Sequence, residues 1–183
     1  MADFDIALAI TLPLEGEQFT DDPDDPGGAT KWGITLDEFS RSSQRLLGID
    51  PTVENLEVLT AAQAGIIYRN DYWNPIKGDS FEFQPLANIV FDFYVNGGTH
   101  ATTLLQNVIN TMNPSAALVV DGSIGQGTLN ALASLPQSDV YNQFKQGRIG
   151  YYQDLATRKP VLGKFLKGWL NRCNTFADLP PSS

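Results

Sequence analysis

The segment 13–35 constrains the fold of this chain more than any other, because it concentrates residues that interrupt regular structure. It follows an apolar stretch, 4–12, which has the character of a buried helix. Pro13 should end or kink that helix, since its ring clashes with the preceding turn. Glu15 then comes just past the helix end, before a loop dense in acidic residues, proline and glycine, with strong turn chemistry at 24–28. The sequence predicts that this glutamate is held by the helix yet faces open space.

Secondary-structure signals elsewhere are mostly helical. The short flanks 18–20 and 30–34 suit a small hairpin, whereas 35–38 and 60–63 are capping boxes that open helices to about Leu47 and Trp73. Further helices are expected at 86–95, which Asn96-Gly97-Gly98 should stop, at 101–111, after Gly127, at 140–157 and at 161–173. The sequence therefore predicts a mainly α protein with one small β-hairpin near its N-terminus.

Length and composition suit one globular unit, in one or two lobes. The chain has 183 residues, of which 42% are hydrophobic. Composition alone suggests a boundary between lobes near 112–115. The first residues lack the basic region of a secretory signal, and no apolar run reaches membrane-spanning length. Cys173 is the single cysteine, which excludes an internal disulfide and fits a reducing compartment. We therefore expect a cytoplasmic protein without stable membrane insertion.

The net charge of −9 argues against a nucleic-acid partner, which would require clustered basic residues. The few basic residues instead gather late in the chain, at Arg148, Arg158, Lys159, Lys164, Lys167 and Arg172. Two interpretations remain open. These residues form a solvated helix face, or they attract an anionic polymer such as cell-wall glycan that carries peptide carboxylates.

Three residues of the first segment suit the hydrolysis of a glycosidic bond. Glu15, Asp24 and Thr30 follow the pattern E-x8-D-x5-T. Such hydrolysis needs one carboxylic acid to protonate the leaving oxygen and a second carboxylate to activate water. By itself the spacing is unspecific: Glu15 also suits a surface position, Asp24 the cap of a turn, and Thr30 a plain strand residue. If Asp24 only caps the turn, Asp22 or Asp25 takes its place.

Metal and nucleophile chemistry find no support. The loop from Asp22 imitates the start of an EF-hand, but Pro26 stands where an oxygen ligand belongs and Gly33 where the closing glutamate should be. His100 is the only histidine and lacks ligand partners at metal spacing. No Ser-His-Asp set or Cys-x-x-Cys pair is available.

Taken in order, the motifs of the chain resemble the N-acetylmuramidases of glycoside hydrolase family 108. The resemblance begins with Leu-Glu-Gly, Asp-Pro-Asp-Asp-Pro-Gly-Gly-Ala-Thr and Trp-Gly-Ile-Thr in 14–35. It continues through 68–73, 91–98, 120–125 with Thr128, and 165–172, and the second half resembles a peptidoglycan-binding region.

This resemblance implies a lysozyme-like, α-rich fold with a catalytic lobe at 1–98 and a peptidoglycan-binding lobe at 99–183. It implies cleavage of the β-1,4 bond between N-acetylmuramic acid and N-acetylglucosamine in bacterial peptidoglycan, without a cofactor. Glu15 would be the general acid, Asp24 the water-activating base and Thr30 a helper on that water. An inverting outcome is expected, because a water must fit between the carboxylates. We expect a monomeric phage or prophage endolysin that reaches the wall after release by a holin-like partner.

Further residues are candidates for substrate binding. The aromatic residues among them belong either to the core or to sugar-stacking platforms, and one or two should line the groove: Trp32, Tyr72, Trp73 and Tyr94. Asn96 either ends a helix or holds an acetamido group with its amide. Glu17 departs from the family pattern, where a small residue is usual, and we expect it to point to solvent.

Three other functions remain open. A lytic transglycosylase needs the acid but no water-holding Asp24. A silent peptidoglycan-binding scaffold would have no reason to keep Glu15, Asp24 and Thr30. An amidase or peptidase is the weakest alternative, because the chain lacks zinc ligands and a nucleophile.

Overall fold

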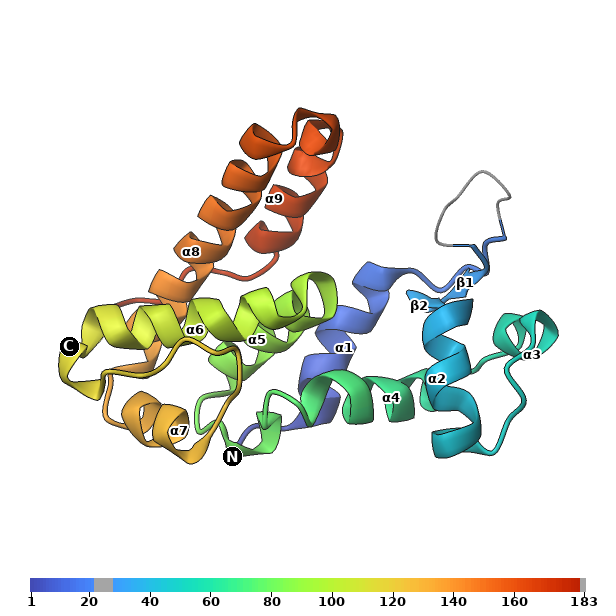
Figure 1. The fold of residues 1–183 in the computed structure, drawn as a ribbon, viewed down its shortest axis with the longest axis horizontal. Coiled ribbons are helices and arrows are strands. Elements are labelled where there is room, and N and C mark those ends of the chain that lie inside the picture. Colours follow the sequence, from blue (N-terminus) through green and yellow to red (C-terminus); the bar gives the residue numbers. More distant parts are fainter. Residues whose placement is uncertain (22–27, 182–183) are drawn as a thin grey trace. The chain divides into compact units, whose positions relative to one another are not determined.

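The structure is a computed structural model that describes residues 1–21 and 28–181. Within these ranges the protein is mainly helical, with one two-stranded hairpin, which confirms the predicted fold class (Figure 1). The chain divides into two compact units, one of residues 4–74 and the other of residues 1–3 with 75–183. The expected lobes at 1–98 and 99–183 are a division by function, which compactness does not test, so that boundary stays a prediction.

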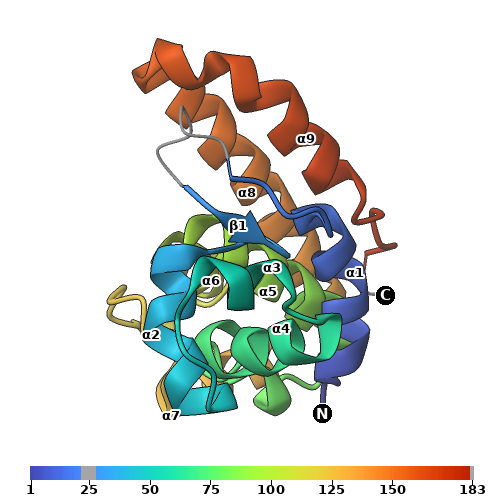
Figure 2. The same ribbon diagram turned by 90° about the vertical axis from the view of Figure 1, so that its right-hand side faces the viewer.

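The first unit surrounds the hairpin with short helices. Its elements are, in chain order, α1 (Phe4–Glu15), β1 (Thr30–Lys31), β2 (Ile34–Thr35), α2 (Leu36–Leu47), α3 (Val53–Glu57), α4 (Ala61–Tyr68) and a π-helical turn (Arg69–Trp73). The strands pair antiparallel, with Thr30 opposite Thr35 and Lys31 opposite Ile34. Figure 2 shows β1 close to α3, and α2 following directly after the hairpin. Its core includes the fully buried Phe39, Leu56, Ala64 and Trp73.

The ends of these helices follow the predicted caps. The side chains of Thr35 and Thr60 accept bonds from the backbone N–H groups of Glu38 and Gln63, and each partner's side chain accepts one in return. Such reciprocal caps satisfy backbone groups that a helix start leaves unpaired. The helix predicted to reach Trp73 does so, although its last turn is π-helical.

Two expectations for the first unit were wrong in part. Pro13 does not end α1, which runs through to Glu15, while the alternative effect, a kink at Pro13, stays a prediction. Ala9, whose carbonyl loses its bond to the proline nitrogen, is exposed together with Pro13, so water can satisfy that carbonyl. The hairpin forms between β1 and β2, whereas Thr20 joins only through a bridge to Thr30, with N–O distances of 2.9 and 2.8 Å.

The second unit is built around α5 (Gln84–Gly97), whose residues from Leu86 to Phe93 are all buried. Its other elements are a 3₁₀ turn (Gly78–Ser80), α6 (Thr99–Met112), a 3₁₀ turn (Pro114–Ala116), α7 (Gln126–Ala133), α8 (Gln137–Arg158), a 3₁₀ segment (Pro160–Phe165) and α9 (Leu166–Asn174). Helices α6 and α8 pack against α5, and α9 runs beside α8 in both ribbon views (Figures 1 and 2). The helix expected at 161–173 is therefore a 3₁₀ segment followed by a shorter α-helix.

A charged cluster lies at the centre of the second unit. The Asp92 carboxylate on α5 pairs with Arg148 on α8 at 2.6 Å and with Arg172 on α9 at 2.8 Å. Asp92 and Arg148 have no exposed surface, and the Arg148 guanidinium also lies 5.1 Å from the centre of the Phe93 ring. The expectation of a solvated basic face is thus wrong for Arg148 and for Arg172, which is only 12% exposed. Their charges hold three helices together instead.

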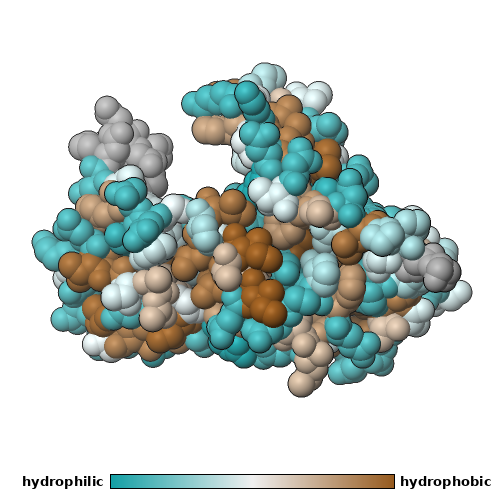
Figure 3. Space-filling view, turned by 180° about the vertical axis from the view of Figure 1, so that it is seen from behind, coloured by the Kyte–Doolittle hydropathy of each residue, from teal (hydrophilic) through white to brown (hydrophobic). Residues whose placement is uncertain are grey.

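Apolar side chains also reach the surface. On α1, Ile6, Ile10 and Leu14 recur every four residues and are 49%, 36% and 39% exposed. Figure 3 shows exposed apolar residues in brown, interspersed with hydrophilic residues in teal. Among the described residues, no helix combines the length and apolar character needed to cross a bilayer.

Candidate active site

Glu15 occupies the last position of α1, where its half-buried side chain packs against the hairpin turn. Gly33 is the residue in contact: a β-carbon added to it would lie 2.7 Å from Glu15 Cβ and 2.9 Å from Glu15 Oε2. The same β-carbon would lie 3.0 Å from the Tyr68 hydroxyl. The Glu15 carboxylate and the Tyr68 hydroxyl therefore both lie close to Gly33. Only glycine leaves room for them, because any other residue would place a β-carbon against both groups.

The turn itself is tight and strained. Trp32 and Gly33 connect the two strands with φ angles of 54° and 71°, as a two-residue hairpin turn of type I′ requires. Left-handed backbone at a tryptophan costs about 1–2 kcal/mol. Two hydrogen bonds fix it: Trp32 Nε1 donates to the Leu59 carbonyl at 2.9 Å, and the Tyr68 hydroxyl donates to the Trp32 carbonyl at 2.9 Å. The turn that faces Glu15 is held from both sides.

Two tyrosines form the wall next to Glu15. Tyr68 is the last residue of α4 and Tyr72 lies in the π-helical turn that follows, and their rings stack with centroids 5.2 Å apart. The Tyr72 hydroxyl donates to Glu38 Oε1 at 2.9 Å. Burial first, then the negative charge of Glu38, raises the pKa of Tyr72 far above its ordinary value, and the Glu15 carboxylate adds a smaller contribution. Tyr72 therefore stays a neutral hydrogen-bond donor at physiological pH, within electrostatic reach of Glu15.

Tyr72 also lines a pocket of about 340 Å³. Its wall is polar: Asp71 accepts hydrogen bonds from the Ser42 hydroxyl and from the Arg45 guanidinium, the latter at 2.9 Å. Glu38 lines the same pocket, so the carboxylate that orients Tyr72 is also part of this wall. Tyr72 thus lines the polar pocket and also stacks on Tyr68, whose hydroxyl bonds the turn that contacts Glu15.

Thr30 opens strand β1. Its hydroxyl donates to the Gly28 carbonyl at 3.1 Å, and its backbone pairs with Thr20. Because the hydroxyl proton is used, the Thr30 oxygen can act only as an acceptor toward a third group. Asp24, and with it the alternatives Asp22 and Asp25, lies outside the described residues. Their expected roles stay predictions, as does that of Thr30.

The remaining candidates take different places. Trp73 has no exposed surface and packs edge-on against Phe4, so it belongs to the core and cannot stack on a sugar. Trp32 is half-buried, its indole N–H already bonded. Tyr94 and Asn96 lie on α5, in the other compact unit. Burial raises the pKa of Tyr94, and the Asn96 amide oxygen accepts a hydrogen bond from Tyr152.

Sequence reasoning missed three residues of this site. Gly33, Glu38 and Tyr68 were noted only for their part in a turn, a capping box and a family motif, yet they hold Glu15 and its neighbours in place. The available signal was the spacing of Tyr68 and Tyr72, because residues four apart share one helix face. Glu17 is exposed, as expected. Within residues 1–21 and 28–181, no three His, Cys, Asp or Glu side chains group as metal ligands.

The chain is similar to known proteins along most of its length. Residues 8–98 match the family model described as "Glycosyl hydrolase 108", and residues 100–174 match that described as "Predicted Peptidoglycan domain". The solved structure of Brucella abortus SagA is similar, with a TM-score of 0.74 and 30% sequence identity over 94% of this chain and 90% of that one. None of the curated proteins compared matches the sequence.

Proposed function

Because the chain belongs to the glycosyl hydrolase 108 family and is a glycoside hydrolase that acts on peptidoglycan, we propose that it is an N-acetylmuramidase with Glu15 as its general acid. The bond cleaved is the β-1,4 bond from N-acetylmuramic acid to N-acetylglucosamine. The contact between the Glu15 carboxylate and the Gly33 turn carries this proposal. It gives the Glu15 carboxylate a defined position near the Tyr68 hydroxyl, as a proton donor to a glycosidic oxygen needs.

The proposed reaction uses water as the nucleophile. Glu15 protonates the leaving oxygen, while the Asp24 carboxylate takes a proton from a water on the opposite face of the sugar. Thr30 accepts a hydrogen bond from that water, because its own proton is engaged by the Gly28 carbonyl. Direct attack by water inverts the anomeric carbon, so the first product is the α-anomer.

Tyr68 and Tyr72 act as positioning residues in this scheme. Tyr68 bonds the Trp32 carbonyl and so fixes the turn against which Glu15 rests. Tyr72 is fixed in turn by Glu38, whose other oxygen accepts hydrogen bonds from the backbone N–H and the hydroxyl of Thr35, both at 2.9 Å. The first turn of α2 is thereby tied to the wall beside the proton donor. A fixed wall keeps the acid in one orientation as charge develops on the sugar.

We further propose that the enzyme is a monomeric endolysin of a phage or prophage. It accumulates in the bacterial cytoplasm and reaches the wall when a holin-like partner opens the membrane. The free, fully buried Cys173 supports folding in a reducing compartment.

Analysis of the products tests the reaction. Digestion of purified peptidoglycan should give new reducing ends on N-acetylmuramic acid, with the α-anomer first in time-resolved NMR. New 1,6-anhydro-muramic ends would identify a lytic transglycosylase instead. Wall binding without new ends would identify a scaffold, and free stem peptides would identify an amidase.

A further inference from the structure

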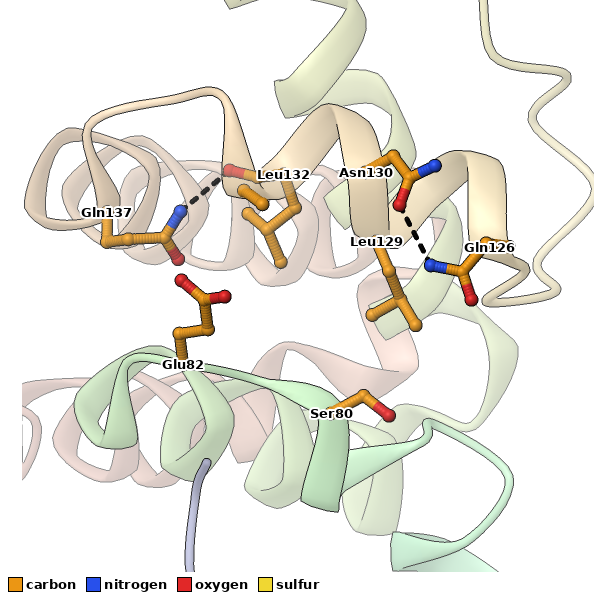
Figure 4. A pocket seen from close by; sticks show the side chains of 8 residues that line it. Ser80, Glu82, Gln126, Leu129, Asn130, Leu132 and Gln137 are labelled. Carbon is orange, nitrogen blue, oxygen red and sulfur yellow. Dashed lines mark hydrogen bonds between the residues drawn. The ribbon is translucent and has the colours of Figure 1, made fainter.

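A pocket of about 190 Å³ is lined by residues of the second unit, none of which belongs to the proposed active site. Ser80 and Glu82, which precede α5, form one side, and α7 with the first residue of α8, Gln137, forms the other (Figure 4). Pockets for drug-sized ligands span about 300–1,000 Å³. The cavity therefore suits a group the size of one side chain and is too small for a disaccharide.

The hydrogen bonds around this cavity leave acceptor atoms facing it. The Gln137 amide nitrogen donates to the carbonyls of Leu132 and Leu135, at 2.7 and 3.0 Å. Both of its N–H groups are thus used, and this also fixes which end of the amide is oxygen. Figure 4 shows the free Gln137 oxygen and the Glu82 carboxylate pointing toward one another. Two acceptors that face each other are complemented by a donor placed between them.

The remaining surfaces of the cavity define what kind of donor fits. Among the described residues that line the pocket, Glu82 is the only charged one, and none is a lysine or arginine. Leu129, Leu132 and Ala133 supply an aliphatic wall. A single carboxylate is too few for Ca²⁺, which takes six to eight oxygen ligands. An ammonium group on a short alkyl chain satisfies both the acceptors and the apolar wall.

We propose that this cavity binds the free amine of the diamino acid, lysine or diaminopimelate, in the stem peptide of peptidoglycan. The inference rests on the proposed function, because peptidoglycan brings an alkyl ammonium group to the enzyme on each peptide that carries one. The lining joins Ser80 and Glu82 from the residues matched by the hydrolase model with others from the peptidoglycan-domain model. The cavity thus recognises the peptide, while the Glu15 site recognises the glycan.

Titration calorimetry with paired peptides tests this assignment. The probes are the tetrapeptide L-Ala-γ-D-Glu-L-Lys-D-Ala, the same peptide acetylated on the lysine amine, the diaminopimelate analogue, and cadaverine as a plain diamine. We expect at least one free-amine peptide to bind the full-length protein, and acetylation or Glu82→Gln to weaken that binding roughly three- to tenfold. Glu57→Gln, which removes an exposed carboxylate from the other unit, is the matched control and should change nothing.

Each outcome bears on the inference. Equal binding of the free and acetylated peptides, or unchanged binding by Glu82→Gln, would overturn it, as would cadaverine binding as tightly as the peptides. Glu82→Lys supplies the cavity with its own ammonium group and should abolish peptide binding. Cleavage of glycan strands stripped of peptides is measured separately with the same variants and should not change. If the wild-type protein cleaves glycan but binds the free and acetylated peptides equally, this inference alone is refuted. If it binds the free-amine peptide selectively but does not cleave glycan, only the proposed function is refuted.

Discussion

The Glu15 carboxylate rests directly on Gly33, so close that a β-carbon at residue 33 would lie 2.9 Å from Oε2. This one contact joins the end of α1 to the hairpin turn and fixes where the proposed proton donor sits. The residues around it, Tyr68 and Trp32, support the same turn through a 2.9 Å hydrogen bond. The proposed chemistry therefore depends on the turn as much as on the glutamate.

Gly33→Ala tests whether the position of the Glu15 carboxylate affects glycan cleavage independently of the stability of the protein. The added methyl group collides with Glu15, so we expect glycan cleavage to fall at least about tenfold, as misplaced catalytic groups do. Gly48→Ala is the matched control, because Gly48 has a similar φ of 67° but nothing within 4 Å of the added carbon. Left-handed backbone costs each variant about 1 kcal/mol in the free energy of unfolding. Equal activity of the two variants, measured as release of reducing sugar, would show that the contact does not matter.

Thr30 offers a second test of the water-directed mechanism. Thr30→Val keeps the shape of the side chain but removes its oxygen. We expect kcat to fall about tenfold or more, which is less than the roughly hundredfold loss on removing a group that bonds the transition state directly, because Thr30 acts only on the water. Thr30→Ser retains the oxygen and should retain most of the activity. If the valine variant keeps a wild-type kcat, the hydroxyl has no role in the reaction.

The central ion cluster should dominate the stability of the second unit. Asp92→Asn leaves the buried Arg148 and the nearly buried Arg172 without their carboxylate, and breaking a buried pair in this way costs about 3–5 kcal/mol. Asp37→Asn removes the partner of Arg41 from an exposed pair and should leave stability close to that of the wild type. Urea unfolding followed by circular dichroism compares the two. Similar midpoints would contradict the structural role of the cluster.

Alkaline pH should weaken the fold through two buried tyrosines. Burial, with a smaller effect of Asp178, raises the pKa of Tyr141 to about 12, and burial with Glu38 also raises the pKa of Tyr72. The folded state then holds these protons more tightly than the unfolded state, whose tyrosines titrate near pH 10. The stabilisation is therefore complete below about pH 10 and is lost as pH rises toward 12. Thermal unfolding from pH 8 to 11.5 should show this decline, and Tyr141→Phe should flatten it; an identical slope in that variant would contradict the assignment.

Much of the fold could be predicted from local chemistry. The capping boxes at Thr35 and Thr60 start helices where the sequence indicates, since their signals lie within four residues. Helix α3 was missed because it has only five residues, and its start at Thr52 lacks the glutamate or glutamine of a capping box. Pro13 was misjudged because its cost depends on whether the freed carbonyl reaches water, which is a property of the folded surface.

The site was harder to predict, because its support comes from distant segments. The sequence indicated Glu15, but the hydroxyl that supports its turn comes from Tyr68, 36 positions beyond its acceptor Trp32. The charged character of Arg148 likewise suggested a surface, whereas burial against Asp92 is a tertiary property. Spacing along the chain cannot reveal such contacts unless both partners lie on one helix.

The most direct test of the account compares Glu15→Gln with Glu17→Gln on purified peptidoglycan. Both variants remove one carboxylate, two positions apart, but Glu15 contacts the turn whereas Glu17 is exposed. We expect the rate at which Glu15→Gln releases new N-acetylmuramic reducing ends to fall at least roughly a hundredfold, the scale for loss of a general acid, while Glu17→Gln stays near the wild-type rate. Wild-type cleavage by Glu15→Gln, or its loss in Glu17→Gln alone, would contradict the central assignment.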